Sequence, residues 1–316
     1  MTPIRAGVVG VGHLGYHHAR LYCALDGVEL VGVTDVDSER ASKVAAEFGV
    51  RAFPDQAALV EAGATALSIA VPTTFHRVCT LAALEAGADV LVEKPIAATV
   101  EDGEAMVSAA RAAGRILQVG HIERFNGAVV ALRSSLIRPR FIECHRLSTY
   151  PNRGHDVSVV HDLMIHDLDI LLSIEHSGVV SVDAVGVSVF SETEDIANAR
   201  IRFASGCVAN VTASRISVER LRKIRVFSED AYVSTDYSEQ QVMVYRKNGA
   251  IRPGGSYLEA LSIDALEVNK DEPLKREIES FLECVRRRGH PEVSGEDGLA
   301  ALRLADQITT FIRSGV

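Results

Sequence analysis

The stretch IRAGVVGVGHLGYHHARLYCAL, residues 4–25, decides the fold of the amino-terminal part of the chain. It begins with an apolar run over 4–9, continues through Gly10-Val-Gly12-His-Leu-Gly15 and passes into a helical pattern. Between a strand and a helix, the first glycine of G-x-G-x-x-G allows a tight turn, the second lets the backbone approach a ligand and the third lets helix and strand pack closely. Amides at the start of the helix then offer a site for a pyrophosphate. The spacing therefore predicts a dinucleotide site at this turn.

An acidic residue in the expected place favours NAD as the dinucleotide. Asp35 ends the next apolar run and lies 20 residues after Gly15. A carboxylate there accepts hydrogen bonds from the adenosine ribose and repels a 2′-phosphate. Arg40 weakens this preference for NAD over NADP, but Asp37 and Glu39 flank the same stretch. The alternative interpretation is a glycine turn in an α/β protein that binds nothing.

Short runs rich in Val, Ile and Leu alternate with helical patterns over the first 120 residues. We predict strands at 4–9, 28–35, 65–71, 89–93 and 115–120 and helices at 13–25, 38–48, 73–87 and 99–113. This alternation predicts βαβ units and a parallel sheet, and strands that are apolar throughout predict burial of both sheet faces. The fold class is therefore α/β, with a doubly wound parallel sheet in a first domain over residues 1–122.

Residues 123–316 have a different pattern, which predicts an α+β domain with a large, open, mostly antiparallel sheet. Ser205-Gly206 predicts a hairpin turn between two of its strands, and Gly289 is expected to end a helix. The closing helix is expected to pack within this domain or back on the first. The predicted strands lie at 141–150, 180–190, 196–216 and 221–247, and the predicted helices at 124–136, 158–174, 274–288 and 296–313.

Composition narrows the class of protein. With 316 residues, 47% hydrophobic and 24% charged, the chain matches a two-domain globular protein and excludes a disordered chain or a small disulfide scaffold. Apolar runs stay below the ~20 residues that span a bilayer, and the N-terminus lacks a signal-peptide pattern, so we expect a cytoplasmic protein. The net charge of −9, with neither half basic, predicts no nucleic-acid partner. Five scattered cysteines without a CxxC predict reduced thiols.

Glu93-Lys94-Pro95 lies at the carboxyl end of the fourth predicted strand. It therefore lies at the carboxyl edge of the sheet, where open α/β sheets bind ligands. An amine there donates to a substrate hydroxyl or stabilises the alkoxide as hydride leaves. A surface lysine at the end of a strand is the alternative.

The predicted helix 158–174 carries a narrow polar stripe on an otherwise apolar surface. Asp162, His166, Asp169 and Ser173 are spaced 4, 3 and 4 residues apart, so they share one face. Because unpaired burial of a polar group costs about 1–3 kcal/mol, these side chains need polar partners or a cavity. The stripe is therefore either one wall of an active site or an internally hydrogen-bonded part of the core.

A metal site is a third interpretation of this helix, because it contains His-Asp pairs at 161–162 and 166–167. The two histidines lie on different faces of an α-helix, and His145 and His155 fit no zinc spacing. We therefore predict that the protein holds no metal.

With these residues in view, the chain resembles the Gfo/Idh/MocA oxidoreductase family. The matching segments are GVVGVGHLG (7–15), VPTTFH (71–76), LVEKP (91–95), GHIERFN (120–126), the D-x-x-x-H-x-x-D helix (162–169) and SGEDGLAALRLADQI (294–308). The resemblance implies an N-terminal Rossmann domain and a second domain whose open sheet commonly mediates oligomers, here a homodimer or homotetramer. It also implies hydride transfer between NAD(P) and a hydroxyl carbon of a sugar or cyclitol.

The resemblance also assigns roles to residues. Lys94, Asp162 and His166 are the implied catalytic set, and the Lys94–Pro95 peptide is expected to be cis. The implied cofactor contacts are Gly10, Gly12, His13, Leu14, Gly15, Asp35, Val71, Pro72, Thr73, His76, Glu93, Lys94 and His121. The three residues of the catalytic set are also expected to contact the substrate, and Arg124 and Arg153 are added as expected substrate contacts from the charge of a diphosphate. Many members carry three glycines before the catalytic Asp, where this chain has HDVSVVH (155–161).

The segments 120–126, 141–147 and 160–169 are most similar to a subgroup that oxidises the 3-hydroxyl of UDP-N-acetylglucosamine before transamination, on a route to amide-linked lipid A. In the expected mechanism His166 takes the hydroxyl proton, Asp162 orients or charge-balances His166, and Lys94 steadies the oxygen. The reverse assignment, with Lys94 as base and His166 as donor, stays open.

Cations are expected near a diphosphate. Arg124, Arg146 and Arg153 are the candidates, with ordinary surface arginines as the alternative. The basic run over 215–225 predicts a solvated strand surface or a subunit contact. Three other functions remain open: a dehydrogenase of a free cyclitol or simple sugar, a non-catalytic NAD-binding regulator, and a metal hydrolase.

Overall fold

The computed structural model describes residues 2–135, 138–150, 157–250 and 256–315. The chain forms two compact units, each described here by itself. The first unit comprises residues 1–122 and 272–302, and the second comprises 123–271 and 303–316. The first break between the units falls after Ile122, and residues 272–302 belong to the first unit.

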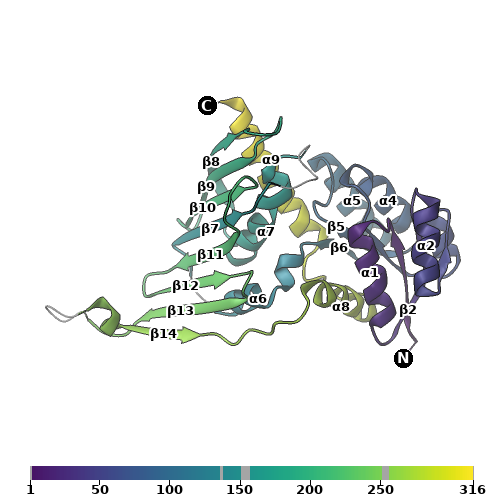
Figure 1. The fold of residues 1–316 in the computed structure, drawn as a ribbon, viewed down its shortest axis with the longest axis horizontal. Coiled ribbons are helices and arrows are strands. Elements are labelled where there is room, and N and C mark those ends of the chain that lie inside the picture. Colours follow the sequence, from purple (N-terminus) through teal and green to yellow (C-terminus); the bar gives the residue numbers. More distant parts are fainter. Residues whose placement is uncertain (1, 136–137, 151–156, 251–255, 316) are drawn as a thin grey trace. The chain divides into compact units, whose positions relative to one another are not determined.

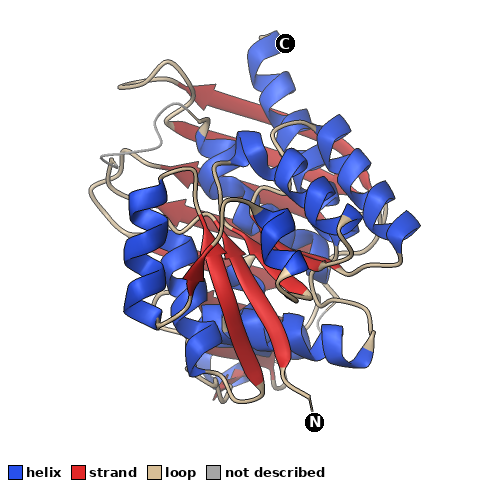
Figure 2. Cartoon of the chain, turned by 90° about the vertical axis from the view of Figure 1, so that its right-hand side faces the viewer, coloured by secondary structure: helices blue, strands red, loops and turns tan. Residues whose placement is uncertain are grey.

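The first unit is built on a six-stranded parallel sheet in the order β3-β2-β1-β4-β5-β6. This is the strand order of a doubly wound dinucleotide-binding fold, so the predicted Rossmann class is confirmed. Figure 2 shows helices on either side of the strands. The strands are β1 (Ile4–Val9), β2 (Val28–Thr34), β3 (Arg51–Ala52), β4 (Ala66–Ile69), β5 (Asp89–Glu93) and β6 (Leu117–Gly120). The helices are α1 (His13–Ala24), α2 (Ser38–Phe48), α3 (Gln56–Glu61), η1 (Thr73–Phe75), α4 (His76–Glu85), α5 (Val100–Ala113) and α8 (Pro273–Arg287).

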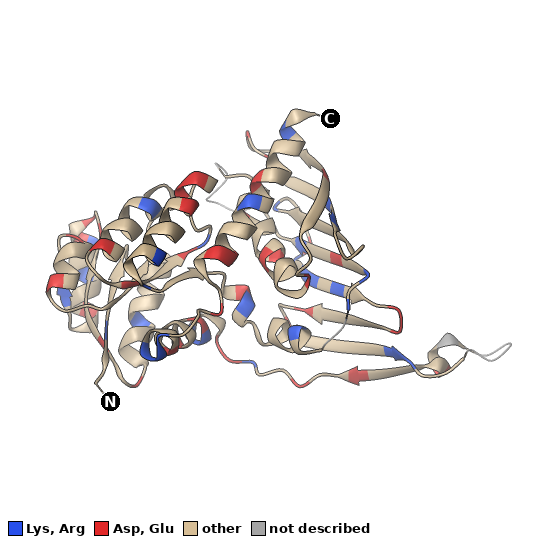
Figure 3. Ribbon diagram, turned by 180° about the vertical axis from the view of Figure 1, so that it is seen from behind, with Lys and Arg blue, Asp and Glu red and all other residues tan. Residues whose placement is uncertain are grey.

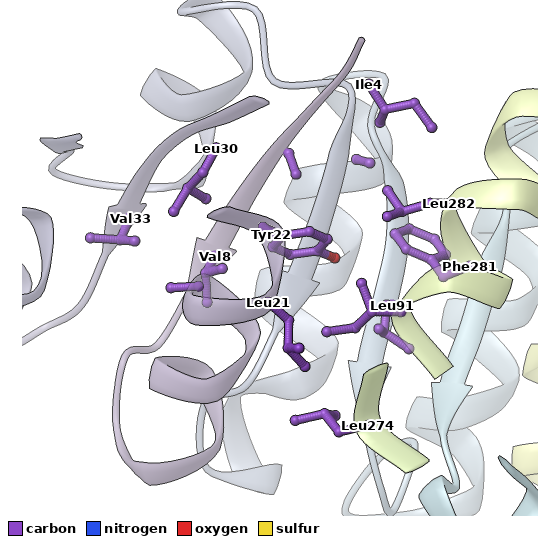
Figure 4. Packing of buried hydrophobic residues seen from close by; sticks show 14 of the residues in the cluster. Ile4, Val8, Leu21, Tyr22, Leu30, Val33, Leu91, Leu274, Phe281 and Leu282 are labelled. Carbon is purple, nitrogen blue, oxygen red and sulfur yellow. The ribbon is translucent and has the colours of Figure 1, made fainter. Parts of the chain in front are cut away.

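The core of the first unit explains why α8 belongs to it. Strands β4, β5 and β6 are buried along their whole length, as apolar strands covered on both faces must be. Figure 4 shows Leu274, Phe281 and Leu282 of α8 packed in one cluster with Tyr22 of α1 and Leu91 of β5. An amphipathic helix can bury its apolar face against any apolar surface, so its sequence pattern alone does not identify the surface on which it packs.

The end of α8 differs from the sequence expectation. The residue in the left-handed region is Arg288, with φ of 54°, and not Gly289. The Arg288 guanidinium donates to Asp89 Oδ2 at 2.5 Å and to the Gly114 carbonyl at 2.7 Å. These bonds to the first unit's own strand and loop hold Arg288 in a conformation that glycine adopts more easily.

The second unit contains an eight-stranded sheet in the order β14-β13-β12-β11-β7-β10-β9-β8, labelled in Figure 1. Among the described strands of this sheet, only β7 and β10 pair in parallel, so the predicted mostly antiparallel sheet is confirmed. Gly206, with φ of 85°, lies in the turn between β9 and β10, as predicted. The strands are β7 (Phe141–Leu147), β8 (Val179–Val187), β9 (Ile196–Phe203), β10 (Val208–Ser214), β11 (Leu221–Phe227), β12 (Ala231–Asp236), β13 (Gln241–Lys247) and β14 (Leu261–Ala265).

The helices of this unit and the shared last helix complete the chain. They are η2 (Ile122–Phe125), α6 (Gly127–Ser134), η3 (Val160–Met164), α7 (Ile165–Ile174), η4 (Tyr257–Ala260) and α9 (Gly295–Ser314). Inward positions of β7, Ile142, Cys144 and Arg146, are buried and alternate with half-buried outward ones. Figure 3 shows acidic and basic residues interspersed along the helices and strands of each unit. Among the described residues, no helix is both long and apolar enough to cross a membrane.

Candidate active site

The glycine turn between β1 and α1 has the geometry that its sequence predicts. Gly10 has φ of 83°, and a Cβ there would lie 2.8 Å from the Ala70 carbonyl oxygen. A Cβ on Gly15 would lie 1.8 Å from the Gly10 carbonyl oxygen, so helix and turn touch without room for a side chain. A Cβ on Gly12, the residue that caps α1, would meet nothing within 4 Å. Gly12 therefore leaves its backbone open to a ligand at the helix N-terminus, which fits a pyrophosphate.

These contacts predict opposite phenotypes for two neighbouring substitutions. Gly15→Ala forces backbone to move and is expected to lower the free energy of unfolding by about 1–3 kcal/mol. Gly12→Ala is expected to leave stability within about 0.5 kcal/mol of wild type but to weaken NADH binding, because its methyl group fills the space beside the helix amides. Urea unfolding and calorimetric titration with NADH measure the two effects. Equal loss of stability in both variants would contradict this account of Gly12.

Asp35 directly follows β2 and contacts the glycine turn. Its Oδ2 accepts a hydrogen bond from the Val11 amide at 2.8 Å, and its Oδ1 accepts one from the Asp37 amide at 2.9 Å. The Arg40 guanidinium lies 3.5 Å from Asp35 Oδ2 and 3.0 Å from Asp37 Oδ2. Two carboxylates therefore compensate the charge of Arg40, which would favour a 2′-phosphate. This charge balance fits NAD better than NADP.

Exchange of this carboxylate changes the choice of cofactor. In Asp35→Ser, loss of a charged hydrogen-bond acceptor for the ribose is expected to raise KM for NAD by about 10- to 100-fold. KM for NADP is expected to fall, because Arg40 then faces the 2′-phosphate with one carboxylate fewer. Asp37→Ser, on the same turn, removes a carboxylate from Arg40 but not the expected ribose acceptor, so it is expected to leave KM for NAD unchanged. An unchanged NAD to NADP ratio of kcat/KM in Asp35→Ser would refute the assignment.

The loop after β4 carries the next group of predicted cofactor residues. Val71 and Thr73 are half-buried and Pro72 is exposed, and these three stay predictions. His76 is only 1% exposed, with Nε2 2.9 Å from the Val71 carbonyl and Nδ1 2.9 Å from the Pro95 carbonyl. Burial lowers the pKa of His76, against a smaller raising effect of these carbonyl hydrogen bonds. His76 therefore ties two loops together, and its contact with cofactor stays a prediction.

Lys94 lies directly after β5, and its peptide bond to Pro95 is cis, as expected. Its side chain is half-buried, whereas Glu93 and His121 beside it are buried. Because β5 pairs with β4 and β6, these residues share the carboxyl edge of the sheet with the Gly10 turn and Asp35. The described part of the first unit thus places the predicted dinucleotide residues and Lys94 along one edge.

In the second unit, Asp162 and His166 lie on either side of a change in helix type. Residues 160–164 form a π-helical turn, and α7 continues from Ile165 as an α-helix. A π-turn is wider than an α-turn and is frequent at functional sites. Both Asp162 and His166 are half-buried. The even 100° spacing assumed from sequence is therefore wrong before Ile165, although both predicted catalytic residues stay within one continuous helical segment.

The remaining members of the polar stripe belong to the core. Asp169 is 1% exposed, and its Oδ1 lies 3.3 Å from Arg124 Nη1. The Ser173 hydroxyl donates to the Ile170 carbonyl at 2.7 Å. The internally hydrogen-bonded interpretation is thus correct for these two positions. Arg124 is buried with Asp169, which argues against the predicted contact between Arg124 and a diphosphate.

A buried charge cluster anchors α7 to the sheet. Arg146 donates to Asp167 through Nε at 2.8 Å and Nη2 at 3.1 Å, and to Glu123 Oε1 through Nη1 at 2.9 Å. Arg146 is 3% exposed and Asp167 is fully buried. The proposed contact between Arg146 and a diphosphate is therefore wrong, because its guanidinium is held by carboxylates of its own unit. The sequence signal was available, since Arg146 occupies an inward position of β7 with Ile142 and Cys144.

A second buried ion pair, Asp195 and Arg215, holds the segment that precedes this helix. Asp195 accepts hydrogen bonds from the amides of residues 189–191 and from Arg215 Nε at 2.8 Å. Burial acts to raise the pKa of Asp195, but these hydrogen bonds outweigh it and hold the pKa well below its ordinary value. Arg215 also donates to the Val157 carbonyl at 2.6 Å. The prediction of a solvated surface over 215–225 is thus wrong for Arg215, which is 1% exposed.

Other predicted residues are placed differently. Arg153 and His155 lie outside the described residues. His161 approaches Thr309 of α9, with Nδ1 3.5 Å from the hydroxyl oxygen, and burial lowers its pKa. His13 and Leu14 are exposed at the start of α1, and their contact with cofactor stays a prediction.

Two family models match the chain in sequence. The NAD-binding Rossmann domain of the Gfo/Idh/MocA oxidoreductase family matches residues 4–121, and the C-terminal domain of the same family matches residues 114–234. These matches meet at the boundary between the six-stranded and eight-stranded sheets.

Relatives that match over the whole length point the same way. A UDP-N-acetylglucosamine 3-dehydrogenase of Acidithiobacillus ferrooxidans is 36% identical over 99% of both chains. A solved structure of UDP-N-acetylglucosamine 3-dehydrogenase from that organism superposes with a TM-score of 0.92, also over 99% of both chains. A scyllo-inositol 2-dehydrogenase (NAD(+)) of Bacillus subtilis is 27% identical over 99% of this chain and 95% of its own. The chain therefore belongs to the Gfo/Idh/MocA family of NAD-binding oxidoreductases.

Proposed function

We propose that this oxidoreductase uses NAD to oxidise the 3-hydroxyl of UDP-N-acetylglucosamine. The carrying observation is the full-length similarity to UDP-N-acetylglucosamine 3-dehydrogenase, at 36% identity. Inositol dehydrogenases match at 27% over the whole chain or at 33–34% over little more than half of it. The 3-keto sugar formed would then be consumed by a transaminase, as the subgroup resemblance implies.

The proposed chemistry assigns three roles to residues of the chain. His166 accepts the proton of the 3-hydroxyl, and Asp162 orients the imidazole and balances its charge. Lys94 donates a charge-assisted hydrogen bond to the same oxygen, so that negative charge developing there is stabilised. NAD, when bound, would supply the hydride acceptor. The support for this set is the motif match of Lys94, Asp162 and His166, together with the half-buried state of all three.

One cation is proposed for the diphosphate of the substrate. Arg153 precedes the helix that carries Asp162, and an arginine matches the geometry of a phosphate. Arg124 and Arg146 are not part of this proposal, because buried carboxylates engage both of them.

A substrate panel tests the proposed function. We expect NADH formation at 340 nm with UDP-N-acetylglucosamine, and kcat/KM about 10²-fold or more above that for myo-inositol, because a site built for the substrate's polar groups rejects an analogue lacking them. Free N-acetylglucosamine is the matched control for the nucleotide. Faster turnover of myo-inositol would favour the cyclitol alternative. NAD binding without turnover of any sugar would favour the regulator.

We also propose a homodimer or homotetramer formed through the eight-stranded sheet. Outward side chains of neighbouring strands make an aromatic row, in which Phe227 stacks on Tyr232 and Tyr232 on Tyr245, with ring centroids 5.4 and 4.2 Å apart. Exposed Ile263 on β14 extends it. Such patches mark interaction sites. Light scattering measures the mass, and Tyr245→Glu is expected to lower it to that of one chain.

The cytoplasm is the compartment that we propose. All five cysteines are free thiols, as is usual for proteins in a reducing compartment.

A further inference from the structure

Four polar side chains in the first unit form a continuous line of hydrogen bonds that ends at Glu93 of β5. The Tyr22 hydroxyl on α1 lies 2.7 Å from the Ser68 hydroxyl on β4, and Ser68 Oγ lies 2.9 Å from His18 Nδ1. His18 Nε2 in turn lies 3.0 Å from Glu93 Oε1. Tyr22, Ser68 and His18 are fully buried, and Tyr22 sits within the apolar cluster of Figure 4. This line starts in the core and ends on the residue before Lys94.

The donors in this line have a consistent direction with a neutral imidazole. A Glu93 carboxylate is an acceptor only, so His18 Nε2 carries a proton, and in a neutral imidazole Nδ1 is then the acceptor. The Ser68 hydroxyl then donates to Nδ1, and the Tyr22 hydroxyl donates to Ser68. Burial acts to raise the pKa of Glu93, but the His18 hydrogen bond and nearby positive charge outweigh it, so the pKa is lowered and the carboxylate form is favoured. Each group is therefore satisfied, which makes the line rigid.

The other side of Lys94 is held by a second buried histidine. His76, at the start of α4, lies 2.9 Å from the Pro95 carbonyl and 2.9 Å from the Val71 carbonyl. The residue before Lys94 is thus fixed by its side chain and the residue after it by its backbone, from two different helices. Between them Lys94 is half-buried.

We propose that His18, acting through Glu93, is a positioning residue that holds the backbone of Lys94 in its working position, with His76 holding the far side of the same loop. The inference rests on the proposed role of Lys94. A small displacement of a catalytic group can lower the rate by up to about 10²-fold without removing any group that touches substrate. Loss of the His18 bond therefore acts on kcat and leaves the glycine turn and its NAD affinity in place.

The cluster also has a composition that a metal ion could use. His18, Glu93 and Glu277 of α8 each bring one ligand atom within 4.8 Å of the other two. Metal analysis of the purified enzyme, before and after dialysis against EDTA, is therefore part of the test. A stoichiometric metal whose removal abolishes activity would overturn the positioning role of the hydrogen bond.

A double-mutant cycle tests the inference directly. His18→Leu is expected to lower kcat about 10- to 100-fold, with KM for NAD within about 3-fold of wild type and with kcat measured on folded protein well below Tm. His18→Gln places an amide donor near the Nε2 position and is expected to recover most of the loss. In a Lys94→Ala background, His18→Leu is expected to change kcat by less than about 2-fold, because its target is gone. Exposed His290→Leu is the control.

The outcomes separate this inference from the proposed function. Normal turnover by Lys94→Ala alone would refute the role of Lys94. If Lys94→Ala is slow and the double variant His18→Leu/Lys94→Ala loses the same further factor in kcat as His18→Leu alone, only the positioning role is refuted. Failure of His18→Gln to recover kcat would also refute only that role. Should His18→Leu not fold, Ser68→Ala, which removes the donor to Nδ1, replaces it in the same cycle, and a loss independent of Lys94 again overturns the inference.

Discussion

Lys94→Ala is expected to lower kcat with UDP-N-acetylglucosamine by about 10²- to 10⁴-fold, the range for loss of an acid–base or oxyanion-stabilising group. The lost amine lies at the carboxyl edge of the parallel sheet, directly after β5 and next to the buried Glu93 carboxylate. KM for NAD is expected to change much less than kcat, because the glycine turn and Asp35 are untouched. Steady-state rates of NADH formation measure both quantities.

Two further variants make this prediction specific. Lys94→Arg keeps the positive charge but replaces a compact ammonium by a planar fork, so it is expected to stay well below wild type. Lys43→Ala removes an exposed lysine of α2 and is expected to be indistinguishable from wild type. Near-full turnover by Lys94→Ala would leave the dinucleotide fold standing and remove the catalytic assignment.

Most strands and helices of the first unit were predictable from sequence, because short-range patterns of apolar residues and glycines specify them. Strands such as β4 and β5 are short apolar runs, and α1 begins at a glycine turn. Such patterns indicate strand, turn and helix in their order along the chain. β3 and α3, with two and six residues, are too short to leave a period and were missed. The placement of α8 was missed for another reason, since its apolar face says that it packs but not on which surface.

The positions of Asp35 and Lys94 in the fold were predictable, because each belongs to a motif at the end of an apolar strand. The surroundings of a side chain were not predictable where they depend on hydrogen bonds between segments that are distant in the sequence. The predicted stripe over 162–173 requires an evenly spaced α-helix, but a π-turn interrupts the spacing, and Asp169 pairs with Arg124 of another segment. Asp167, the fully buried acid of this helix, lies outside the stripe. The sequence indicates its partner only through Arg146, which occupies an inward position in the alternating pattern of β7.

That partnership gives the largest stability effect that we expect. Arg146→Met fills a similar volume but leaves Asp167, which is fully buried, without its two hydrogen bonds, and leaves Glu123 with weaker partners. Breaking a buried pair from one side typically costs about 3–5 kcal/mol of unfolding free energy. Arg225→Met is the matched control on the next strand, since its partner Glu143 is exposed enough for the pair to contribute no more than about 1 kcal/mol. Urea unfolding at pH 8 measures both.

The pH dependence of this loss identifies its cause. Burial raises the pKa of Asp167, and Arg146 opposes that rise, so removal of Arg146 raises the pKa further. A carboxyl whose folded pKa lies above its unfolded value is stabilised by protonation, and the folded state gains relative to the unfolded state as the pH falls through the folded pKa. The difference between wild type and Arg146→Met is therefore expected to shrink between pH 8 and pH 5.5. A difference that is constant with pH would trace the loss to packing against Tyr237 and not to an uncompensated buried charge.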